Sequence, residues 1–337
     1  MTLPMRGRDV IRWGILGCGD VTEVKSGPGF QKAERSALVA VMRRDLRKAQ
    51  DYAARHGVPR AYDSADDLIG DPGVDAVYVA TPPSSHCELA LRVVAAGKPC
   101  LVEKPMALDH AECVRMNEAF ARAGQPLWVA YYRRALPRFL LVRDMLREGA
   151  IGRLSSLRIE VRERLASPDR AGGWRFDPRA AGAGLFFDLG SHSLDLVDFL
   201  AAPIAQVAGF AANTAGAYGA EDVTVASFLL ETSVPGTGEW NFNAGHPHDA
   251  LTLTGADGVL TTPIFADTDV VLARGGRDER HPVRNPPHVH QPLIQTIVDE
   301  LLGRGRCDST GESGARTARV MDQCVAAYYT DRVRSGI

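Results

Sequence analysis

The chain has 337 residues, 45% of them hydrophobic and 24% charged, which is enough apolar material for two domains with separate cores. The formal charge of −2 excludes a general attraction to nucleic acid or to an anionic membrane surface. No run of about eighteen apolar residues is present, so no membrane span is expected. Residues 1–8 lack the apolar core of a signal peptide, and the six cysteines lack CxxC spacing. We expect a cytoplasmic protein with reduced cysteines.

A short apolar strand ending at Leu16 leads into a glycine-rich turn. Gly17 would permit the tight bend, and Gly19 would let a pyrophosphate approach the backbone. A helical stretch toward Lys32 follows, and its first amides favour negative charge. Glycine pairs are common in turns, but strand, GxGxx and helix in this order are the context of a dinucleotide site. The sequence therefore predicts dinucleotide binding at this turn.

The end of the next strand, residues 37–42, bears on the choice of nucleotide. An acidic residue there would bind the ribose 2′-hydroxyl, but Met42 stands at that place and Arg43 and Arg44 follow. Because arginine pairs a phosphate bidentately, the sequence favours NADP(H) over NAD(H). Asp45 either binds the ribose or caps the helix that follows.

The strand at residues 75–80 ends in the turn Thr81-Pro82-Pro83-Ser84-Ser85-His86. This turn lies at the carboxyl end of a strand, where open parallel sheets bind ligands. Ser84 or Ser85 is predicted to cap the next helix. His86 is interpreted as a first-turn helix residue rather than a catalyst.

A further apolar strand ends abruptly in Glu103-Lys104-Pro105. Proline disfavours a helical backbone at the preceding residue, so the Lys104 ammonium can leave the strand end as a fixed charge. The alternative is a solvated lysine in a loop. Strands alternate with helices at this rhythm through about residue 150, which predicts a doubly wound α/β domain over residues 1–150.

Residues 151–337 show a different pattern. Residues 154–165 alternate apolar and charged side chains, and four more strands follow between residues 207 and 254. We predict an α+β domain with a large, open, mostly antiparallel sheet and one helix on one face. The open face is expected to form a homodimer or homotetramer contact. Two C-terminal helices are expected to pack back on the first domain.

The segment from Gly182 to Asp195 carries the most informative polar residues of this half. Read as an α-helix, it places Asp188, His192 and Asp195 on one face. A histidine with a carboxylate one turn away is suited to proton transfer near neutral pH. The alternative is a buried polar face satisfied by hydrogen bonds.

Other candidate residues have weaker support. Trp174-Arg175 would cover a ligand or cap the sheet. His246-Pro247-His248 and His288-Val289-His290 have HxH spacing, but they lie among prolines without a cysteine pair or ordered carboxylates, so no metal site is predicted.

Five motifs in this order resemble those of the Gfo/Idh/MocA family (glucose–fructose oxidoreductase, inositol dehydrogenase, rhizopine catabolism). They are GILGCGDVT from Gly14, ATPPSSH from Ala80, VEKP from Val102, YYRR from Tyr131 and GAGLFFDLGSHSLD from Gly182. The resemblance covers nearly the whole chain. It implies a Rossmann domain followed by an open-sheet α/β domain, with a nicotinamide cofactor in the cleft between them.

The resemblance also implies roles for individual residues. Lys104, followed by a cis peptide bond to Pro105, matches the family's catalytic lysine, and Asp188 and His192 match its other catalytic positions. Tyr132 departs from the asparagine common in relatives, so a relative's sugar specificity does not carry over. The residues expected to bind the cofactor lie in the five motifs, at the strand end before Asp45 and at Trp174. They are Gly17, Gly19, Asp20, Val21, Arg43, Arg44, Thr81, Pro82, His86, Glu103, Lys104, Arg133, Trp174 and Arg175.

The predicted reaction is hydride transfer between the nicotinamide and a carbinol carbon of a sugar, polyol or related small molecule. His192 is expected to move the hydroxyl proton, Lys104 to stabilise charge on the oxygen, and Asp188 to orient the imidazole or contact substrate. Two alternatives stay open: a glycoside hydrolase of the same family that retains its NAD, and a regulator that binds NADP(H) without turnover.

Overall fold

The structure is a computed structural model that describes residues 5, 8–165 and 173–335. Residues 1–4 and 6–7, on which the expectation about the polar opening segment largely rests, lie outside the described residues. Two compact units are present. Unit 1 comprises Met1–Ala107, Ala111–Leu136 and Pro286–Ala315, and unit 2 comprises Leu108–His110, Pro137–Asn285 and Arg316–Ile337.

Unit 1 contains a parallel sheet of six strands in the order β3-β2-β1-β4-β5-β6. Its central strands are short and almost fully buried, as both faces of a parallel sheet usually are. The strands are β1 (Ile11–Leu16), β2 (Ser36–Met42), β3 (Arg60–Tyr62), β4 (Ala76–Val79), β5 (Cys100–Val102) and β6 (Leu127–Val129). This is the doubly wound sheet that the sequence predicts, and the prediction is confirmed.

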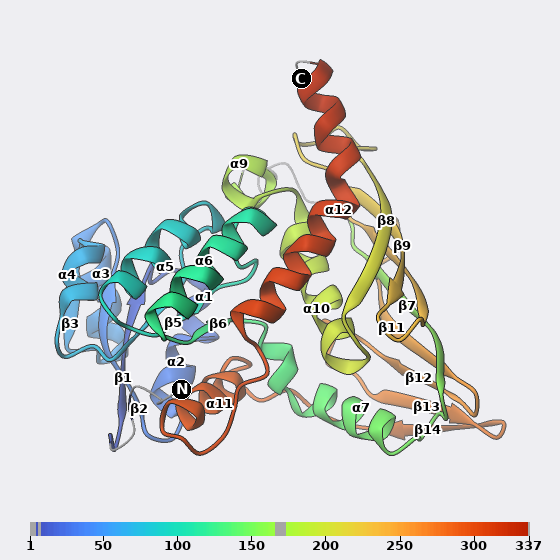
Figure 1. The fold of residues 1–337 in the computed structure, drawn as a ribbon, viewed down its shortest axis with the longest axis horizontal. Helices are drawn as coiled ribbons and strands as arrows, with labels where there is room; N and C mark the ends of the chain where they lie inside the picture. The colour runs from blue at the N-terminus through green and yellow to red at the C-terminus, as the bar shows by residue number, and fades with distance from the viewer. Residues whose placement is uncertain (1–4, 6–7, 166–172, 336–337) are drawn as a thin grey trace. The chain divides into compact units, whose positions relative to one another are not determined.

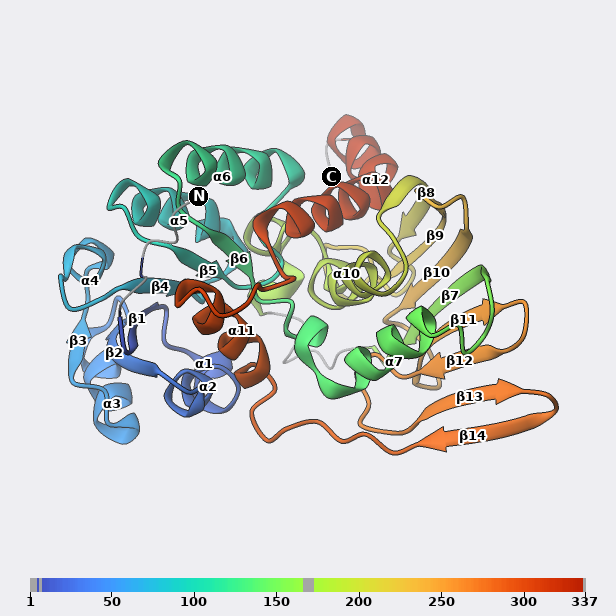
Figure 2. The ribbon, with the colours of Figure 1, turned by 60° about the horizontal axis from the view of Figure 1, so that its bottom comes forward.

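Helices cover both faces of this sheet. Figure 2 shows α5 and α6 on one face and α2 and α3 on the other. The helices of unit 1 are α1 (Asp20–Val24), α2 (Gly27–Lys32), α3 (Leu46–His56), α4 (Ala65–Gly70), η1 (Pro83–Ser85), α5 (His86–Ala95), α6 (His110–Ala123), η2 (Tyr132–Ala135) and α11 (Gln291–Leu301). Although α11 is remote in sequence, it packs against α2 and η2.

The helical stretch predicted after Gly19 is divided into α1 and α2. The break falls at Ser26, a buried residue whose hydroxyl donates to the carbonyl of Val21 at 3.3 Å. Gly27 and Pro28 open α2, and proline is well suited to the first turn of a helix. The Gly-Pro-Gly sequence therefore starts the second of two short helices.

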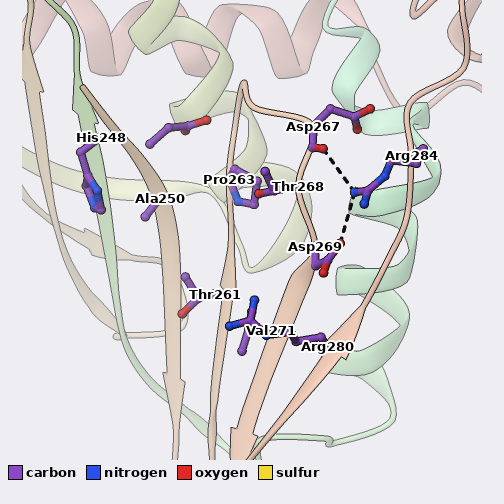
Figure 3. A pocket seen from close by; sticks show the side chains of 11 residues that line it. His248, Ala250, Thr261, Pro263, Asp267, Thr268, Asp269, Val271, Arg280 and Arg284 are labelled. Atoms are coloured by element: carbon purple, nitrogen blue, oxygen red, sulfur yellow. Dashed lines mark hydrogen bonds and ion pairs between the residues drawn. The ribbon is translucent and has the colours of Figure 1, made fainter. Parts of the chain in front are cut away.

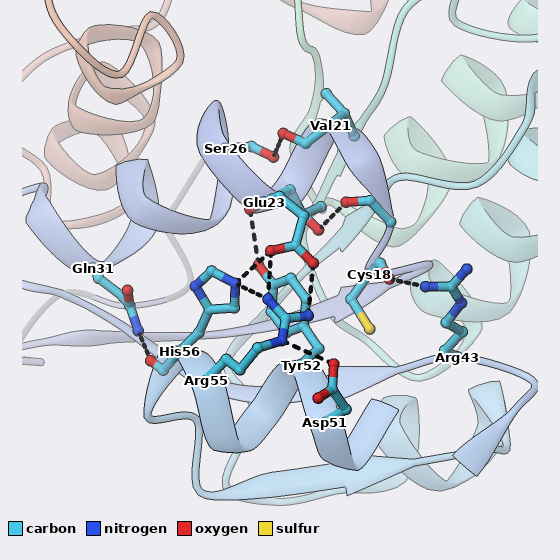
Figure 4. A network of polar contacts seen from close by, with 12 residues as sticks. Cys18, Val21, Glu23, Ser26, Gln31, Arg43, Asp51, Tyr52, Arg55 and His56 are labelled. Atoms are coloured by element: carbon cyan, nitrogen blue, oxygen red, sulfur yellow. Dashed lines mark hydrogen bonds and ion pairs between the residues drawn. The ribbon is translucent and has the colours of Figure 1, made fainter. Parts of the chain in front are cut away.

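A network of charged side chains joins α1 to α3 (Figure 4). The carboxylate of Glu23 accepts hydrogen bonds at 2.8 Å from each terminal nitrogen of the Arg55 guanidinium. His56 contacts the same carboxylate at 2.7 Å, and Asp51 accepts from Arg55 Nε at 2.8 Å. The hydrogen bonds from Arg55 hold the pKa of Glu23 at about 2.

Unit 2 contains a mixed, mostly antiparallel sheet of eight strands in the order β14-β13-β12-β11-β7-β10-β9-β8. Only β7 and β10 pair in parallel among these strands. The strands are β7 (Leu154–Arg162), β8 (Ile204–Ala212), β9 (Val223–Leu230), β10 (Pro235–Asn241), β11 (His248–Gly255), β12 (Val259–Thr262), β13 (Val270–Arg274) and β14 (Arg277–His281). The predicted sheet is confirmed, and β12, β13 and β14 extend it beyond the predicted strands.

One face of this sheet is covered by helices (Figure 1). Trp240 of β10 packs on Phe186 in an edge-to-face contact at 4.8 Å, and the backbone of α12 lies against Gly209 of β8. The helices are α7 (Pro137–Arg147), η3 (Trp174–Phe176), α9 (Pro178–Ala181), η4 (Phe186–Gly190), α10 (Ser191–Leu200) and α12 (Gly311–Ser335), the last of which starts in unit 1.

No described helix is both long enough and apolar enough to cross a membrane. All six cysteines are buried free thiols. Burial raises the pKa of Cys18, in the glycine turn, to about 11, which keeps this thiol protonated near neutral pH.

Glu23→Gln tests the network between α1 and α3. Because the folded pKa of Glu23 lies below its ordinary value of 4.5, its stabilisation is fully present above that value and is lost as the pH falls through about 2. We expect the variant to melt about 2 °C below the parent protein at pH 7 and level with it near pH 2.

Thermal denaturation followed by circular dichroism across this pH range measures the difference. Glu118→Gln is the matched control, since Glu118 makes one exposed contact with Arg122 at 3.6 Å. A difference for Glu23→Gln that does not change with pH would contradict the network's role.

Candidate functional site

The glycine turn has the geometry that the sequence predicts. Gly17 has φ of +89°, and a Cβ there would lie 2.8 Å from the Thr81 side chain. Gly19 faces open space, because a Cβ built on it meets nothing closer than 3.9 Å. Gly17 therefore allows β1 to turn against the end of β4, and Gly19 leaves its backbone open to a bulky group.

Arg43 lies beside this turn and donates to the carbonyl of Cys18 at 3.3 Å (Figure 4). Arg44 is exposed, as is Asp45. The Asp45 carboxylate accepts from the amides of Arg47 and Lys48 at 3.1 and 3.4 Å, so it caps α3. The strand end thus offers two arginines, one of them next to the glycine turn.

Of the other predicted nucleotide contacts nearby, Asp20 and Pro82 are exposed and Val21 is half-buried.

The turn after β4 is fixed by buried polar contacts. The fully buried His86 begins α5, and its ring nitrogens lie 2.7 and 3.0 Å from the carbonyls of Thr81 and Pro105. Burial lowers the pKa of His86. This imidazole thus joins the Thr81 turn to the turn that follows β5. Ser85 stands at the predicted N-cap of α5, but its hydroxyl makes no capping hydrogen bond and instead donates to Thr81 Oγ1 at 2.7 Å.

Glu103 and Lys104 follow β5 at the same edge of the sheet. The Lys104–Pro105 peptide bond is cis, which confirms that expectation. The buried carboxylate of Glu103 accepts from the Lys104 amide at 3.0 Å and from the hydroxyl of Tyr78 in β4. Burial raises the pKa of Glu103, while the Lys104 charge opposes that rise. The carboxylate thus holds the backbone from which the Lys104 side chain departs.

His290, whose role the sequence leaves open, lies in the same part of unit 1. Its ring stacks on Tyr132 with centroids 4.4 Å apart, and its Nδ1 lies 3.8 Å from Glu103 Oε1. Burial lowers the pKa of His290 to about 3, so the imidazole is neutral and this approach is no salt bridge. Arg133 also stacks on the Tyr132 ring, with its guanidinium carbon 4.9 Å from the ring centre.

The glycine turn, the Thr81 turn and the Glu103–Pro105 turn therefore adjoin at the carboxyl edge of the parallel sheet. This is where open α/β sheets bind ligands. The sequence signals for Gly17, Thr81 and Lys104 each lay at a strand end. No such signal pointed to Tyr78 or His290, because the former reads as a strand residue and the latter as part of a proline-rich loop.

In unit 2 the segment that carries Asp188 and His192 is not a continuous α-helix. Residues Phe186–Gly190 form a π-helical turn, and the α-helix begins at Ser191. The predicted α-helical spacing is therefore wrong between Asp188 and His192. The Phe186 ring packs against Gly190, where a Cβ would collide with it, and this close contact accompanies the wider turn. Such turns are frequent at functional sites.

The side chains of this segment are held on several sides. His192 is 3% exposed, and its ring meets Phe265 edge-on at 6.1 Å. Ser193 accepts a hydrogen bond from Trp240 Nε1 at 2.8 Å, which ties α10 to the sheet. Asp195 is fully buried, as expected if this face of the helix is a buried polar face satisfied by hydrogen bonds.

Trp174 and Arg175 lie with Asp188. The Nε of Arg175 is 3.4 Å from an Asp188 oxygen, and its guanidinium carbon is 4.6 Å from the Trp174 ring centre. Trp174 is 38% exposed, so this stacked pair is open to solvent. Asp188, Arg175 and Trp174 therefore present a carboxylate, a cation and an aromatic ring together.

A pocket of about 440 Å³ lies elsewhere in unit 2, at the ends of β11, β12 and β13 (Figure 3). Its acidic side chains are already engaged. Asp249 accepts from the amides of residues 264–266, and Arg284 contacts Asp269 at 3.2 Å. Its lining includes His248 but none of the residues predicted as catalytic or cofactor-binding. Within the described residues, no group of three or more His, Cys, Asp or Glu could hold a metal ion.

Two family models match this chain. An oxidoreductase family with an NAD-binding Rossmann fold matches residues 11–131, and a GFO/IDH/MocA C-terminal domain matches residues 139–261. Oxidoreductase P35 of Formosa agariphila is 36% identical over 316 residues, which cover 93% of this chain and 97% of the relative. The 1,5-anhydro-D-fructose reductase of Ensifer adhaerens is 27% identical and covers 90% and 92%.

Solved structures share the fold. Aldose–aldose oxidoreductase from Caulobacter crescentus has a TM-score of 0.85 and 24% identity, covering 96% of this chain and 98% of its own. Levoglucosan dehydrogenase in complex with NADH has a TM-score of 0.85 and 20% identity, covering 95% and 97%.

Tyr78→Phe tests whether the tyrosine hydroxyl stabilises the buried Glu103 carboxylate. The phenyl ring keeps the packing of Tyr78 on Phe30, so the change removes chiefly the hydrogen bond. We expect the free energy of unfolding to fall by about 2 kcal/mol, because the carboxylate loses a donor without regaining water.

Urea denaturation gives the value. In the matched control, Tyr62→Phe, the lost hydroxyl donates to Asp71 at 3.0 Å in a partly exposed position, and we expect a smaller loss. Equal losses for the two variants would show that burial of Glu103 does not amplify the contact.

Proposed function

The chain belongs to the Gfo/Idh/MocA family of NAD(P)-dependent oxidoreductases, and we propose that it transfers a hydride reversibly between the nicotinamide and a carbinol or carbonyl carbon of a sugar, polyol or related small molecule. The observation that carries the proposal is the meeting of three turns at one sheet edge. The open glycine turn, the Thr81 turn and the turn before Lys104 adjoin there.

The residues at this edge fit a dinucleotide. Gly17 allows the tight turn, Gly19 leaves its backbone open to the pyrophosphate, and Arg43 places a cation beside it. When bound, the nicotinamide accepts or gives the hydride. Arg43 and Arg44 support a preference for NADP(H), because both are cations at the strand end where a 2′-phosphate would need them.

Lys104, His192 and Asp188 are proposed as the catalytic residues. Lys104 hydrogen-bonds the carbinol oxygen and stabilises negative charge as it develops there. His192 takes the hydroxyl proton in oxidation and returns it in reduction. Asp188, held beside Arg175, orients the imidazole or contacts a substrate hydroxyl. The remaining predicted contacts, Trp174 and Arg175, are proposed to face the cofactor or the substrate.

The substrate class rests on relatives. The names of the similar proteins include an anhydrofructose reductase, a levoglucosan dehydrogenase and an aldose–aldose oxidoreductase. In this chain the Tyr132 ring contacts both His290 and Arg133. A large aromatic group there alters the shape offered to a sugar, so the proposal names the class and no single sugar.

Two rival functions make different predictions. A glycoside hydrolase of this family would hold its NAD without exchange and show no net change in NAD(P)H. A regulator that binds NADP(H) would show no turnover on any substrate. A regulator needs neither the Lys104 ammonium nor the His192 imidazole, which favours an enzyme.

We also propose a homodimer or homotetramer formed through the open face of the sheet in unit 2. Phe210 and Val225 pair across β8 and β9 and are 74% and 41% exposed. Large exposed apolar side chains that adjoin on a sheet face favour burial against another copy.

Lys104→Ala is expected to lower kcat by at least about 100-fold, because a fixed donor to the developing oxyanion is lost. Affinity for NADPH, measured by fluorescence titration, should stay within about threefold. Turnover is measured on levoglucosan with NAD(P)⁺ and on 1,5-anhydro-D-fructose with NAD(P)H. Lys32→Ala removes an exposed lysine and serves as the control. Unchanged turnover in Lys104→Ala would contradict the assignment of Lys104 as a catalytic residue.

The nucleotide preference is tested by titrating the purified protein with NADPH and NADH after removal of carried-over nucleotide. We expect tighter binding of NADPH, and a loss of about 10- to 100-fold in its affinity when Arg43 and Arg44 are both changed to alanine. Affinity for NADH should hardly change. Arg47→Ala, at an exposed position on α3, is the control. Tight NAD that does not exchange would instead support the glycoside hydrolase.

A further inference from the structure

Glu221 is a buried carboxylate that the proposed reaction does not use. It lies just before β9, and its residue is 1% exposed. Its Oε1 and Oε2 accept from the backbone amide of Gly184 at 2.8 and 3.0 Å. Its Oε2 also accepts from the hydroxyl of Tyr329, in α12, at 2.5 Å. One carboxylate thus joins α12 to the glycine-rich segment that precedes Asp188.

Gly184 is shaped to fit this carboxylate. A Cβ at Gly184 would lie 2.5 Å from the Glu221 carbonyl oxygen and 2.9 Å from its Oε1. Any other residue would therefore push the two segments apart. The contact places a charged acceptor directly on one backbone amide, which is a strong and directional way to fix a chain.

The fixed amide stands at the start of the segment that carries the catalytic candidates. The carbonyl of Gly184 accepts from the amide of Phe187, and this bond opens the π-helical turn that contains Asp188. At the other end, Trp240 holds Ser193, the residue after His192. The segment is therefore anchored on both sides of Asp188 and His192. Glu221 holds it at Gly184, before Asp188, and the sheet holds it at Ser193, after His192.

We propose that Glu221 is a positioning residue, whose carboxylate fixes the Gly184 backbone and thereby sets the π-helical turn that carries Asp188 and leads into His192. The catalytic part of this proposal rests on the proposed function, whereas the structural part does not. An apolar side chain of similar size would avoid the desolvation of a carboxylate, so stability alone does not account for an acid at this position.

The surroundings of Glu221 make its effect dependent on pH. Burial raises its pKa to about 7, and the neighbouring Asp222 adds to the rise, whereas the donors Tyr329 and Gly184 oppose it. Tyr218 is also titratable and lies nearby, and burial together with the two carboxylates raises its pKa. Asp222 itself accepts from the amides of residues 214 and 215. Protonation of Glu221 near neutrality weakens its grip on the Gly184 amide.

Three variants separate the roles of the acceptor, of its charge and of the Tyr329 donor. Glu221→Met removes the acceptor and keeps the bulk, Glu221→Gln keeps an oxygen for Gly184, and Tyr329→Phe removes the second donor. Glu231→Met, at an exposed glutamate at the other end of β9, is the matched control. The first measurement is hydrogen–deuterium exchange of the peptide spanning residues 182–192, which needs no substrate.

We expect exchange in this peptide to rise at least about tenfold in Glu221→Met, to rise less in Glu221→Gln, whose neutral oxygen is a weaker acceptor than a carboxylate, and to stay near the parent value in the control. On levoglucosan or 1,5-anhydro-D-fructose, kcat of Glu221→Met should fall about 10- to 100-fold with KM and NADPH affinity within about twofold. In Tyr329→Phe the acid limb of the kcat profile should move to higher pH, because a donor that lowers the Glu221 pKa is gone. In Glu221→Gln that limb should disappear.

Unchanged exchange in Glu221→Met would overturn the positioning role. Raised exchange with unchanged kcat would overturn its catalytic consequence. If Glu221→Met does not fold, the acid limbs of the kcat profiles of Glu221→Gln and Tyr329→Phe test the proposal instead. Acid limbs identical to that of the parent protein would overturn it. If the parent protein turns over no substrate, the proposed function fails, and the exchange experiment still decides whether Glu221 positions the segment.

Discussion

The buried carboxylate of Glu103 is the interaction on which the candidate site of unit 1 depends. A carboxylate taken out of water is destabilising unless donors surround it, and here the Tyr78 hydroxyl and the Lys104 amide supply them. These donors come from neighbouring parallel strands, so the carboxylate locks the end of β5 to β4. The His86 imidazole connects the next residue, Pro105, to the Thr81 turn. Lys104 thus departs from a backbone that is held on both sides.

Much of the fold follows from local signals in the sequence. Most strands of the parallel sheet are apolar runs, with β3 (Arg60–Tyr62) the exception, and α3 occupies the residues that its Asp45 cap and Gly57 stop indicate. The strand β14 could not be predicted, because Arg277–His281 has no apolar alternation and forms a strand through its pairing with β13. Its partner β13 follows a loop whose acids, Asp267 and Asp269, accept hydrogen bonds from the side chains of Arg138 and Arg284.

The candidate site was less predictable than the fold. Residues at strand ends could be found, because chain geometry brings the ends of parallel strands together. The partners Tyr78, His290 and Glu221 could not, because their importance arises from burial that the local sequence does not reveal. The π-helical turn at Asp188 was missed for a related reason. It depends on how the Phe186 ring packs over Gly190, whereas sequence spacing assumes the regular α-helix.

Each unit uses the same device beside a candidate catalytic side chain. Glu103 accepts from the Lys104 amide and the Tyr78 hydroxyl, and Glu221 accepts from the Gly184 amide and the Tyr329 hydroxyl. Burial raises the pKa of both carboxylates. A core built for stability alone would replace such groups with apolar side chains. A carboxylate instead gives a directional hold on a backbone amide, and that hold is what a reactive side chain on a turn requires.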